Sequence, residues 1–397
     1  MTTHYKLAIA LGAMTALGPL AIDMYVPAMP DMAQDLATSD GAIHRSAMSF
    51  FFGFMLGQLV YGPLSDRFGR RYVVLSALSI FLVASVGCTM SGSVESLVVW
   101  RLVQGFGGAA GMSMAIAITR DLYVGKEAGR MMSLIMMVMG LAPILAPLLG
   151  SAIITIAPWP IIFLVLVFFA LLAMTLTLLW VPETLPPADR NKSSGNVLTH
   201  YWQLLISQSF MPYAGTLALI QGAFFAYIVG SSFVIIKVFG LSSTQYALLF
   251  GLNAIGLTVG TQLLGRLGER IGAHRLVRAA VGGFVALSAL ALVLSLTGAL
   301  TLLSLSVLLF LAIFLMGGIM PGCNQLAMEH NGAMAGTAAS LLGALGFGMG
   351  VVSSAILSLA ESGTATPLLA IMTGFSGLAL IVFTVLMPKG YSSYAPE

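Results

Sequence analysis

Twelve long apolar stretches dominate this sequence, and each is long enough to cross a lipid bilayer as a helix. A helix needs about 20 apolar residues to cross about 30 Å of hydrocarbon, whereas a barrel strand needs about 10 residues of alternating polarity. The stretches do not alternate, which favours helices. The sequence therefore predicts an all-α membrane protein of twelve transmembrane helices, at 6–29, 43–63, 72–91, 97–118, 131–154, 160–181, 211–235, 244–265, 276–296, 301–322, 335–357 and 365–387.

The scarcity of charge agrees with a lipid environment and excludes several functions. Only 8% of the 397 residues are charged, against about 25% in a soluble domain. The net charge of +3 is too small and scattered for a nucleic-acid surface. The two cysteines, Cys88 and Cys323, lie far apart in apolar stretches, which predicts neither a disulfide framework nor a metal site. The sequence has no P-loop and no nucleophile motif, so we expect no enzyme, no cofactor and an ion gradient as the driving force.

The basic residues indicate how the chain is oriented. Loops rich in Lys and Arg stay in the cytoplasm. With the N-terminus inside, 14 of the 17 basic residues lie at cytoplasmic ends, Arg45 and Lys237 lie at outer ends, and Arg101 lies within a helix. Both termini are therefore expected in the cytoplasm. The stretch 183–210 is rich in Pro, Ser and charge, which predicts a flexible cytoplasmic linker between bundles of six helices at 1–182 and 211–397.

An internal repeat relates the two bundles. The loop Gly62–Arg71 reads GPLSDRFGRR, and 203 residues later the chain reads GRLGERIGAHR from Gly265 to Arg275. Glycine, leucine, an acid, arginine and glycine recur in register, and the same shift maps Gly140 onto Gly343. Two related bundles in parallel orientation are typical of transporters whose binding site lies at the bundle interface near the bilayer midplane.

The loop Gly62–Arg71 resembles the signature between helices 2 and 3 of the major facilitator superfamily. Further stretches resemble proton-coupled drug exporters of the Bcr/CflA branch: IDMYVPAMP at 22–30, RLVQG at 101–105, APILAPLLG at 142–150, PET at 182–184 and AGTA at 335–338. The resemblance implies twelve helices around a central cavity. It also implies proton-driven export of small amphiphilic drugs or antibiotics from the cytoplasm across a bacterial inner membrane, by a monomer. A transporter for a metabolite such as a nucleoside, purine or sugar, on the same fold, stays open as the alternative.

Two charges lie deep within the predicted spans, Asp23 and Arg101. Ionisable residues inside a bilayer are costly and mark functional sites by default. At about 1.5 Å per residue, both lie roughly 10 Å from the outer face, so a pair between them is expected. The pair could be a static ion pair that joins two helices. We favour Asp23 as the proton acceptor, with Arg101 tuning it. Some drug exporters carry a second acid where this chain has Thr15, which favours neutral or zwitterionic substrates here.

The resemblance also implies a conformational latch and an antiporter motif. Asp66 would face the start of the helix at 335–337, while Arg70 and Asp121 complete a charge network. The latch residues are Gly62, Asp66, Arg67, Gly69, Arg70, Arg71 and Asp121. Alternatively, the arginines only fix topology. The antiporter motif comprises Gly140, Pro143, Pro147 and Gly150, residue types that bend helices and permit close packing.

Polar and aromatic residues in otherwise apolar stretches are candidates for the substrate cavity. They are Ile22, Tyr25, Gln221, Phe224, Phe225, Asn253 and Asn324, with Tyr227 beside them. Helix packing or lipid contact explains each of them equally well at the level of sequence.

Overall fold

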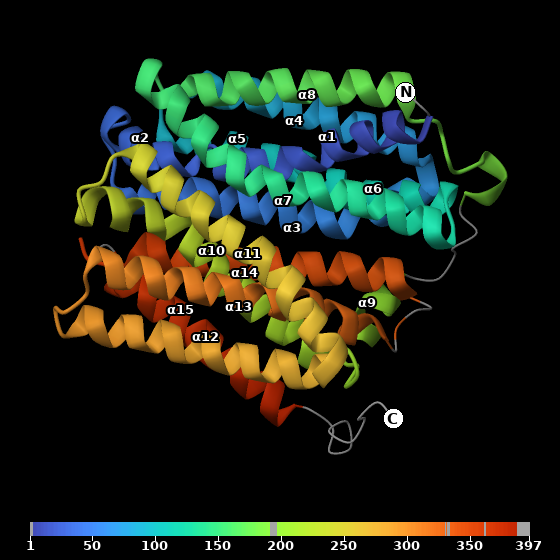
Figure 1. The fold of residues 1–397 in the computed structure, drawn as a ribbon. Coiled ribbons are helices and arrows are strands. Elements are labelled where there is room, and N and C mark those ends of the chain that lie inside the picture. Colours follow the sequence, from blue (N-terminus) through green and yellow to red (C-terminus); the bar gives the residue numbers. More distant parts are fainter. Residues whose placement is uncertain (1–2, 191–196, 330, 332–333, 361–362, 387–397) are drawn as a thin grey trace. The chain divides into compact units, whose positions relative to one another are not determined.

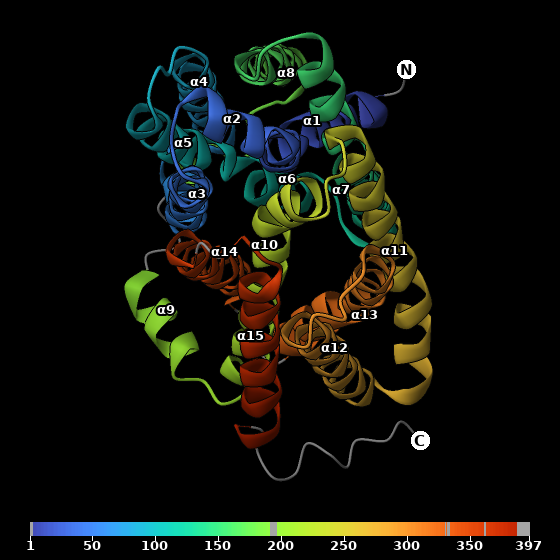
Figure 2. The same cartoon turned by 90° about the vertical axis from the view of Figure 1, so that its left-hand side faces the viewer.

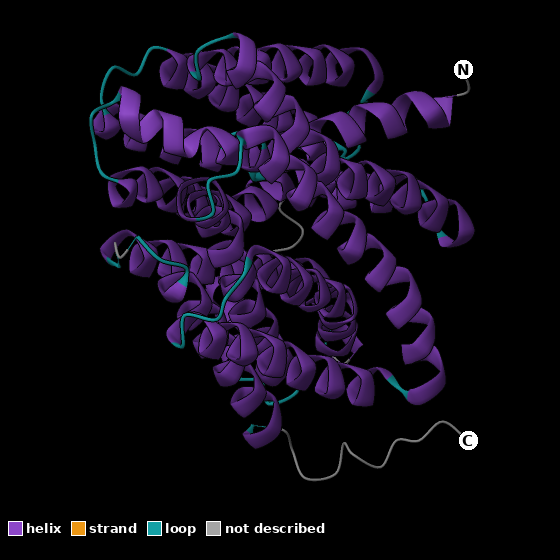
Figure 3. Cartoon of the chain, turned by 60° about the vertical axis from the view of Figure 1, so that its left-hand side comes forward, coloured by secondary structure: helices purple, strands orange, loops and turns teal. Residues whose placement is uncertain are grey.

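The structure is a computed structural model that describes residues 3–190, 197–329, 331, 334–360 and 363–386. Within these ranges the regular structure is helical throughout, with short connecting loops (Figure 3). The chain divides into two compact units, Met1–Val197 and Leu198–Glu397. The boundary falls inside the stretch predicted as a linker.

Unit 1 consists of long helices that lie side by side (Figure 1). In chain order its elements are α1 (Thr3–Asp23), η1 (Val26–Ala28), α2 (Met29–Asp35), α3 (Asp40–Phe68), α4 (Arg70–Thr89), α5 (Val94–Gly108), α6 (Ala110–Leu122), α7 (Gly125–Ile156), α8 (Pro160–Trp180) and η2 (Pro187–Asp189). The main packing partners are α3 with α5, α4 with α5 and α8, and α1 with α7.

Unit 2 repeats this arrangement. Helix α9 (Val197–Leu205) leads into it, followed by α10 (Met211–Ser232), the π-helical turn η3 (Phe233–Val238), α11 (Ser243–Ile271), α12 (Ala273–Leu296), α13 (Leu302–Glu329), α14 (Ala335–Leu359) and α15 (Thr366–Val385). Seen end-on, α11, α12 and α13 cluster together (Figure 2). Helix α10 packs against α14 and α15, as α1 packs against α7 and α8 in unit 1.

The twelve predicted spans are confirmed. Among the described residues, twelve helical segments are long and apolar enough to cross a membrane, the first at His4–Asp35 and the last at Thr366–Val385. Several helices extend beyond the predicted apolar core; the span predicted at 131–154, for example, belongs to a helix that covers Gly125–Ile156. The chain is therefore a multi-pass membrane protein.

The first span differs from the prediction because it is not one continuous helix. α1 ends at Asp23, and the chain resumes as η1 and α2. Pro27 explains the break: it has no N–H to donate to the carbonyl oxygen of Asp23, four residues earlier, and its ring would collide with that carbonyl group. The break therefore places Asp23 at a helix end inside the span.

The linker also differs from the prediction, because part of it is helical. Residues Val197–Leu205 form α9, a segment without glycine or proline. Leu204 is fully buried, whereas Leu198 and Trp202 are exposed. Burial of one apolar face stabilises a short helix that would be marginal alone. Residues 191–196 of the predicted linker lie outside the described residues.

Glycines set the closest helix contacts in both units. A Cβ atom on Gly53 or Gly105 would collide with backbone atoms across the α3–α5 interface. A Cβ atom on Gly260 or Gly317 would do the same across the α11–α13 interface. Small residues allow helix backbones to approach closely where lipid provides no hydrophobic driving force. The corresponding pair of helices therefore packs in the same way in each unit.

Over one segment, the internal repeat relates the two units residue by residue. The 203-residue shift maps the bounds of α3 onto those of α11, and maps Ser39 onto Ser242, whose side chains each cap the following helix. It also maps Gly69 onto Gly272, which adopt φ values of 100° and 90° between paired helices. Such φ values favour glycine. The matching glycines in the two loop sequences thus correspond to the same backbone turn in both units.

Candidate functional site

Asp23 lies at the C-terminal end of α1, where Pro27 breaks the first span. Its side chain is only 4% exposed. It forms no side-chain hydrogen bond or ion pair with another described residue. It is also the one acidic residue that is buried among those described. Because a buried charge without a partner is costly, this carboxyl is a group whose protonation can respond to its surroundings.

Arg101 lies on α5 and is among the largest fully buried side chains of the described residues, at 1% exposure. Its Nη1 atom donates to the Ala21 carbonyl oxygen at 3.0 Å and to Gln104 Oε1 at 2.7 Å. The guanidinium group lies over the rings of Tyr25 and Phe50, 4.5 and 4.3 Å from their centroids. Aromatic faces attract a desolvated cation. Hydrogen bonds and aromatic rings, rather than a carboxylate, therefore hold this charge.

The contact with Ala21 also has a structural role in α1. The last four carbonyl groups of a helix lack partners within it, and a cation near that end interacts favourably with the helix dipole. Arg101 supplies a hydrogen-bond donor and a positive charge at the end of α1, where it bonds Ala21, two residues before Asp23. Gln104 extends the contact to α4 through Ser85 Oγ at 2.8 Å.

The predicted direct pairing of Asp23 and Arg101 is not present in this structure. Neither side chain bonds to the other, although both are buried in unit 1. The physical reason is that Nη1 of Arg101 instead bonds Ala21 and Gln104, and the flanking rings hold the guanidinium group in place. The sequence places both charges at similar depth but does not show which acceptor lies nearer to the arginine.

Two of the predicted cavity residues lie beside this centre. Ile22 is buried in α1 at 8% exposure, and Tyr25 is buried at 1%. The Tyr25 hydroxyl bonds Ser46 Oγ on α3. Tyr25 thus faces the arginine with its ring and fixes the chain after the break with its hydroxyl.

The predicted antiporter motif lies on α7, against α1. Pro147 and Gly150 are buried, while Gly140 and Pro143 are half-buried. A Cβ atom on Gly150 would collide with the backbone of Met24, the residue after Asp23. Gly150 therefore lets α7 approach the break at which the buried acid lies. The structure connects the motif to Asp23 by this packing contact.

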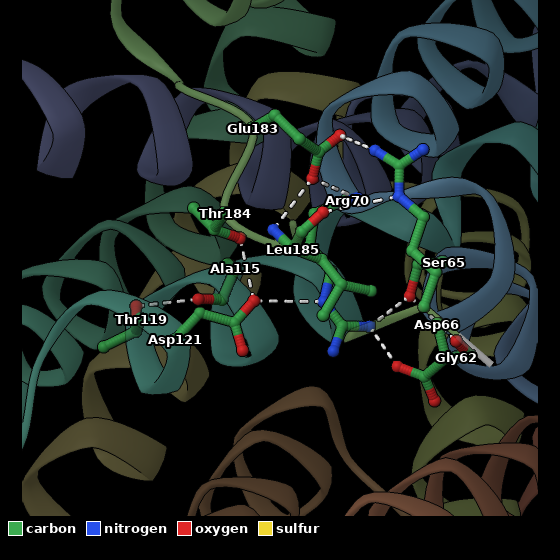
Figure 4. A network of polar contacts seen from close by, with 11 residues as sticks. Gly62, Ser65, Asp66, Arg70, Ala115, Thr119, Asp121, Glu183, Thr184 and Leu185 are labelled. Atoms are coloured by element: carbon green, nitrogen blue, oxygen red, sulfur yellow. Dashed lines mark hydrogen bonds and ion pairs between the residues drawn. The ribbon is translucent and has the colours of Figure 1, made fainter. Parts of the chain in front are cut away.

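The predicted charge network forms at one end of unit 1 (Figure 4). Arg70 Nη1 lies 2.5 Å from Asp66 Oδ1, and Arg70 Nε lies 3.1 Å from Asp121 Oδ2. Arg70 also donates to Ser65 Oγ. Arg70 thus joins α3 to the end of α6. The predicted contact of Asp66 with 335–337 involves the other unit and stays a prediction.

Glu183 and Thr184 also bond to this network, although they are not among the latch residues predicted from the sequence. Glu183 Oε1 accepts from the backbone N–H groups of Arg70, at 2.9 Å, and Leu185, at 3.0 Å. Thr184 Oγ1 donates to Asp121 Oδ2 at 2.8 Å. Arg190 Nη2 lies 3.7 Å from Glu183 Oε2. The segment after α8 therefore binds the loop between α3 and α4.

The other predicted latch residues have separate roles. Gly69 is buried at a positive φ, and a Cβ atom there would collide with the Glu183 carboxylate. The Gly62 carbonyl oxygen accepts from Ser65. Arg71 Nη2 donates to the Leu178 carbonyl oxygen at 2.6 Å. Arg67 is exposed, with its guanidinium group 5.4 Å from the Phe68 ring centroid, so it lies outside the Arg70 network.

In unit 2 several predicted cavity residues form one cluster on α10 and α11. Asn253 Nδ2 donates to the Tyr227 hydroxyl at 2.9 Å. The Tyr227 ring stacks between Phe224 and Phe250, with centroid distances of 6.0 and 5.5 Å. Phe225 instead contacts Phe347 of α14. The cluster combines aromatic surface with an amide and a hydroxyl, groups that can bind an uncharged polar ligand.

Gln221 and Asn324 differ in their surroundings. Gln221 Oε1 is buried without a hydrogen-bond partner, in space that Gly346 leaves open by lacking a Cβ atom. An unsatisfied buried oxygen is an acceptor available to a ligand. Asn324 is exposed, five residues before the end of α13, and the structure does not join it to the cluster.

Some of the missed residues had a signal in the sequence. Gln104 lies three residues after Arg101, which places both on one face of a helix. Glu183 lies three residues after the end of α8 and is the first acid after a long uncharged stretch. By contrast, nothing local in the sequence indicates that Phe50 and the Ala21 carbonyl group contact Arg101, because they come from two other helices.

The twelve spans and the two repeated units define a multi-pass membrane protein made of two related halves. The sequence pattern of the Major Facilitator Superfamily matches residues 11–355. The chain belongs to this superfamily and is therefore a membrane transporter rather than an enzyme.

Relatives of known sequence cover nearly the whole chain. An uncharacterized MFS-type transporter, YdgK of Bacillus subtilis, is 37% identical over 92% of this chain and 91% of its own. Multidrug resistance protein D of Escherichia coli is 31% identical (96% and 95%). A bicyclomycin resistance protein homolog of Haemophilus influenzae is 29% identical (97% of each). The crystal structure of a D-xylose-proton symporter shares the fold, with a TM-score of 0.75 over 97% of this chain and 98% of that one, at 16% identity.

Proposed function

We propose that this transporter exports small amphiphilic drugs or antibiotics in exchange for protons, by alternating access. The observation that carries the proposal is the buried, unpaired carboxyl of Asp23 at a helix break inside a membrane span. The resistance names of two relatives support drugs as the substrate class.

In the proposed cycle, Asp23 is protonated from the outer side and releases its proton to the cytoplasm. Arg101 is the positioning residue: it holds the end of α1 through Ala21, two residues before Asp23. A cation favours the ionised form of a nearby acid. Movement of α1 relative to Arg101 would therefore change the proton affinity of Asp23, which is what coupling requires.

The cluster of Phe224, Tyr227, Asn253 and Gln221 is proposed to bind substrate from unit 2. It contains no charged group, and Thr15 stands where some drug exporters carry a second acid. Together these features favour neutral or zwitterionic compounds. The Arg70 network is proposed as the latch of one state, because ion pairs that water reaches from one side, as at Asp66, can break within a cycle.

The surroundings of the protein follow from the same proposal. In this proposal a bacterial inner membrane supplies the proton gradient, both termini lie in the cytoplasm, which the basic loops support, and one chain acts as a monomer. No cofactor takes part.

Proton exchange by purified protein in liposomes tests the proposal. Drug added to liposomes with the wild-type chain should drive proton movement, and Asp23→Asn should abolish it. Glu95→Gln is the matched control, since Glu95 is an exposed acid in the first turn of α5. Unaltered proton movement in Asp23→Asn would refute the coupling role.

A resistance panel in an efflux-deficient bacterium tests the substrate class. Expression should protect against phenicols, bicyclomycin-like compounds or other amphiphilic drugs. Lack of protection combined with stimulated uptake of a nucleoside or sugar would establish the alternative, a metabolite transporter.

A further inference from the structure

Unit 2 has a groove between α12 and α15 that the proposed transport does not use. Its volume is about 670 Å³. Two arginines lie at one end, and apolar side chains line the rest. The lining residues are Arg275, Arg278, Ala279, Gly282, Leu380, Ile381 and Thr384.

The two arginines carry positive charges that a ligand could bind. Arg275 and Arg278 are exposed and form no ion pair with another described residue. At spacing i, i+3 they share one helix face. They lie in the first two turns of α12, at the positive end of its dipole, where cations do not stabilise a helix. Their side chains therefore do not serve the fold of α12.

The rest of the groove is apolar. Ile381 is 56% exposed. Gly282 faces open space, since a Cβ atom there would meet nothing within 4 Å. The Thr384 hydroxyl donates to backbone carbonyl oxygens of its own helix, so no side-chain donor interrupts the apolar wall. An occupant therefore needs a negative group at one end and apolar chains at the other.

The position of the groove along the membrane span indicates which class of ligand it binds. α12 begins at Ala273 and α15 ends at Val385, so the arginines lie at one membrane edge and the apolar wall extends from them along the span. Basic pockets between transmembrane helices bind the headgroups of anionic lipids. We propose that this groove binds an anionic phospholipid, with its phosphate on Arg275 and Arg278 and an acyl chain along Leu380 and Ile381.

The equivalent place in unit 1 lacks this chemistry. The 203-residue shift maps Arg275 and Arg278 onto Tyr72 and Leu75 of α4. Arg71, the nearest basic residue there, is bonded to the Leu178 carbonyl oxygen of α8. The pair of arginines is thus not a general feature of the repeat but belongs to unit 2.

Native mass spectrometry of the full chain, purified in mild detergent, tests the proposal. The protein is offered phosphatidylglycerol and phosphatidylethanolamine with the same acyl chains. Wild type should bind phosphatidylglycerol preferentially. The double variant Arg275→Gln, Arg278→Gln should lose roughly 30-fold in affinity for it, the effect of two basic residues at a charged membrane surface. Equal binding of the two lipids by wild type would overturn the proposal.

The matched control removes two other exposed arginines from the neighbouring helix α11. Arg266→Gln, Arg270→Gln carries the same net charge as the test variant but leaves the groove intact. It should bind phosphatidylglycerol like wild type. An equal loss in both double variants would show that only net charge matters, which refutes a site.

The apolar half is tested by filling the groove. Gly282→Leu should lower phosphatidylglycerol binding, whereas Gly265→Leu on α11, also in open space, should not. Inorganic phosphate at millimolar concentration should fail to displace the lipid. Displacement by phosphate, or wild-type lipid binding by Gly282→Leu, would indicate a free-anion site and contradict the lipid assignment.

Discussion

Arg101 on α5 bonds the carbonyl oxygen of Ala21, two residues before α1 ends at Asp23. The same nitrogen bonds Gln104, while two aromatic rings flank the guanidinium plane. A planar, permanently charged group with several donors suits such a site, and a lysine ammonium does not. Pro27 ends the helix that carries the buried acid, and the arginine holds that helix end in place.

Replacement of Arg101 should separate charge from geometry. Arg101→Ala leaves buried acceptors unpaired, which costs about 1–3 kcal/mol for each, and we expect drug resistance to be lost. Arg101→Lys keeps the charge and should still lower transport by roughly tenfold, the equivalent of about 1.4 kcal/mol. Drug efflux at matched expression measures both variants. Arg45→Ala, an exposed arginine on α3, should behave like wild type, and normal efflux in Arg101→Ala would contradict the assignment.

Gly150 provides a test of packing beside Asp23. A Cβ atom there collides with the Met24 backbone, so Gly150→Ala must push α7 away from the break. Cores that are overpacked lose about 1–3 kcal/mol, and we expect a lower midpoint of thermal unfolding together with proton leak in liposomes. Gly129→Ala, on the same helix in open space, is the control. A tight, stable Gly150→Ala protein would show that the contact is not needed.

The repeat offers a matched pair for the loop after α3. Gly69 and Gly272 both have positive φ, but only Gly69 lies against the Glu183 carboxylate. Alanine at either position should cost about 1–3 kcal/mol of backbone strain, because both glycines combine a positive φ with an extended ψ. Gly69→Ala should cost more and reduce transport, because it also displaces Glu183 from the Arg70 N–H group. Thermal unfolding and efflux assays compare the two. Equal effects would mean that the Glu183 contact contributes nothing.

Asp66 tests whether the Arg70 network is a latch or only a topology signal. The Asp66 side chain is 44% exposed and that of Arg70 12% exposed. Water screens the pair on the Asp66 side, so we expect it to contribute about 0–1 kcal/mol. Asp66→Ala should therefore leave membrane insertion and stability almost unchanged while it impairs transport. Membrane abundance and efflux are measured together. Loss of the folded protein from the membrane would favour a structural role.

The sequence predicted the spans well because lipid imposes one strong requirement, about 20 apolar residues for each crossing. It also predicted the Arg70–Asp66–Asp121 network, through resemblance. It did not predict the break after Asp23 even though Pro27 was visible, because apolar composition continues across the break. Prolines within α7 show why: Pro143 and Pro147 lie in an unbroken helix, so proline alone does not determine where a membrane helix ends.

Tertiary contacts account for the other differences. The charges on Asp23 and Arg101 are at similar depth, but the acceptors nearest to Arg101 come from positions 21 and 104. Linear order also hides the contact of Glu183 with Arg70, more than a hundred residues apart. In both cases the sequence shows that the side chain is charged. Its bonding partner, however, depends on which helix faces meet in the folded protein.

The two units share a backbone plan but not their buried charges. Helices α10 and α13, the counterparts of α1 and α5, contain no charged residue before Glu329. One buried carboxyl carries one proton at a time. If Asp23 is the carrier, exchange for a neutral drug moves one net charge inward and is driven by both the membrane potential and the pH gradient. Exchange for a monovalent cation would be electroneutral, so the current measured with each type of drug reports on how many protons move.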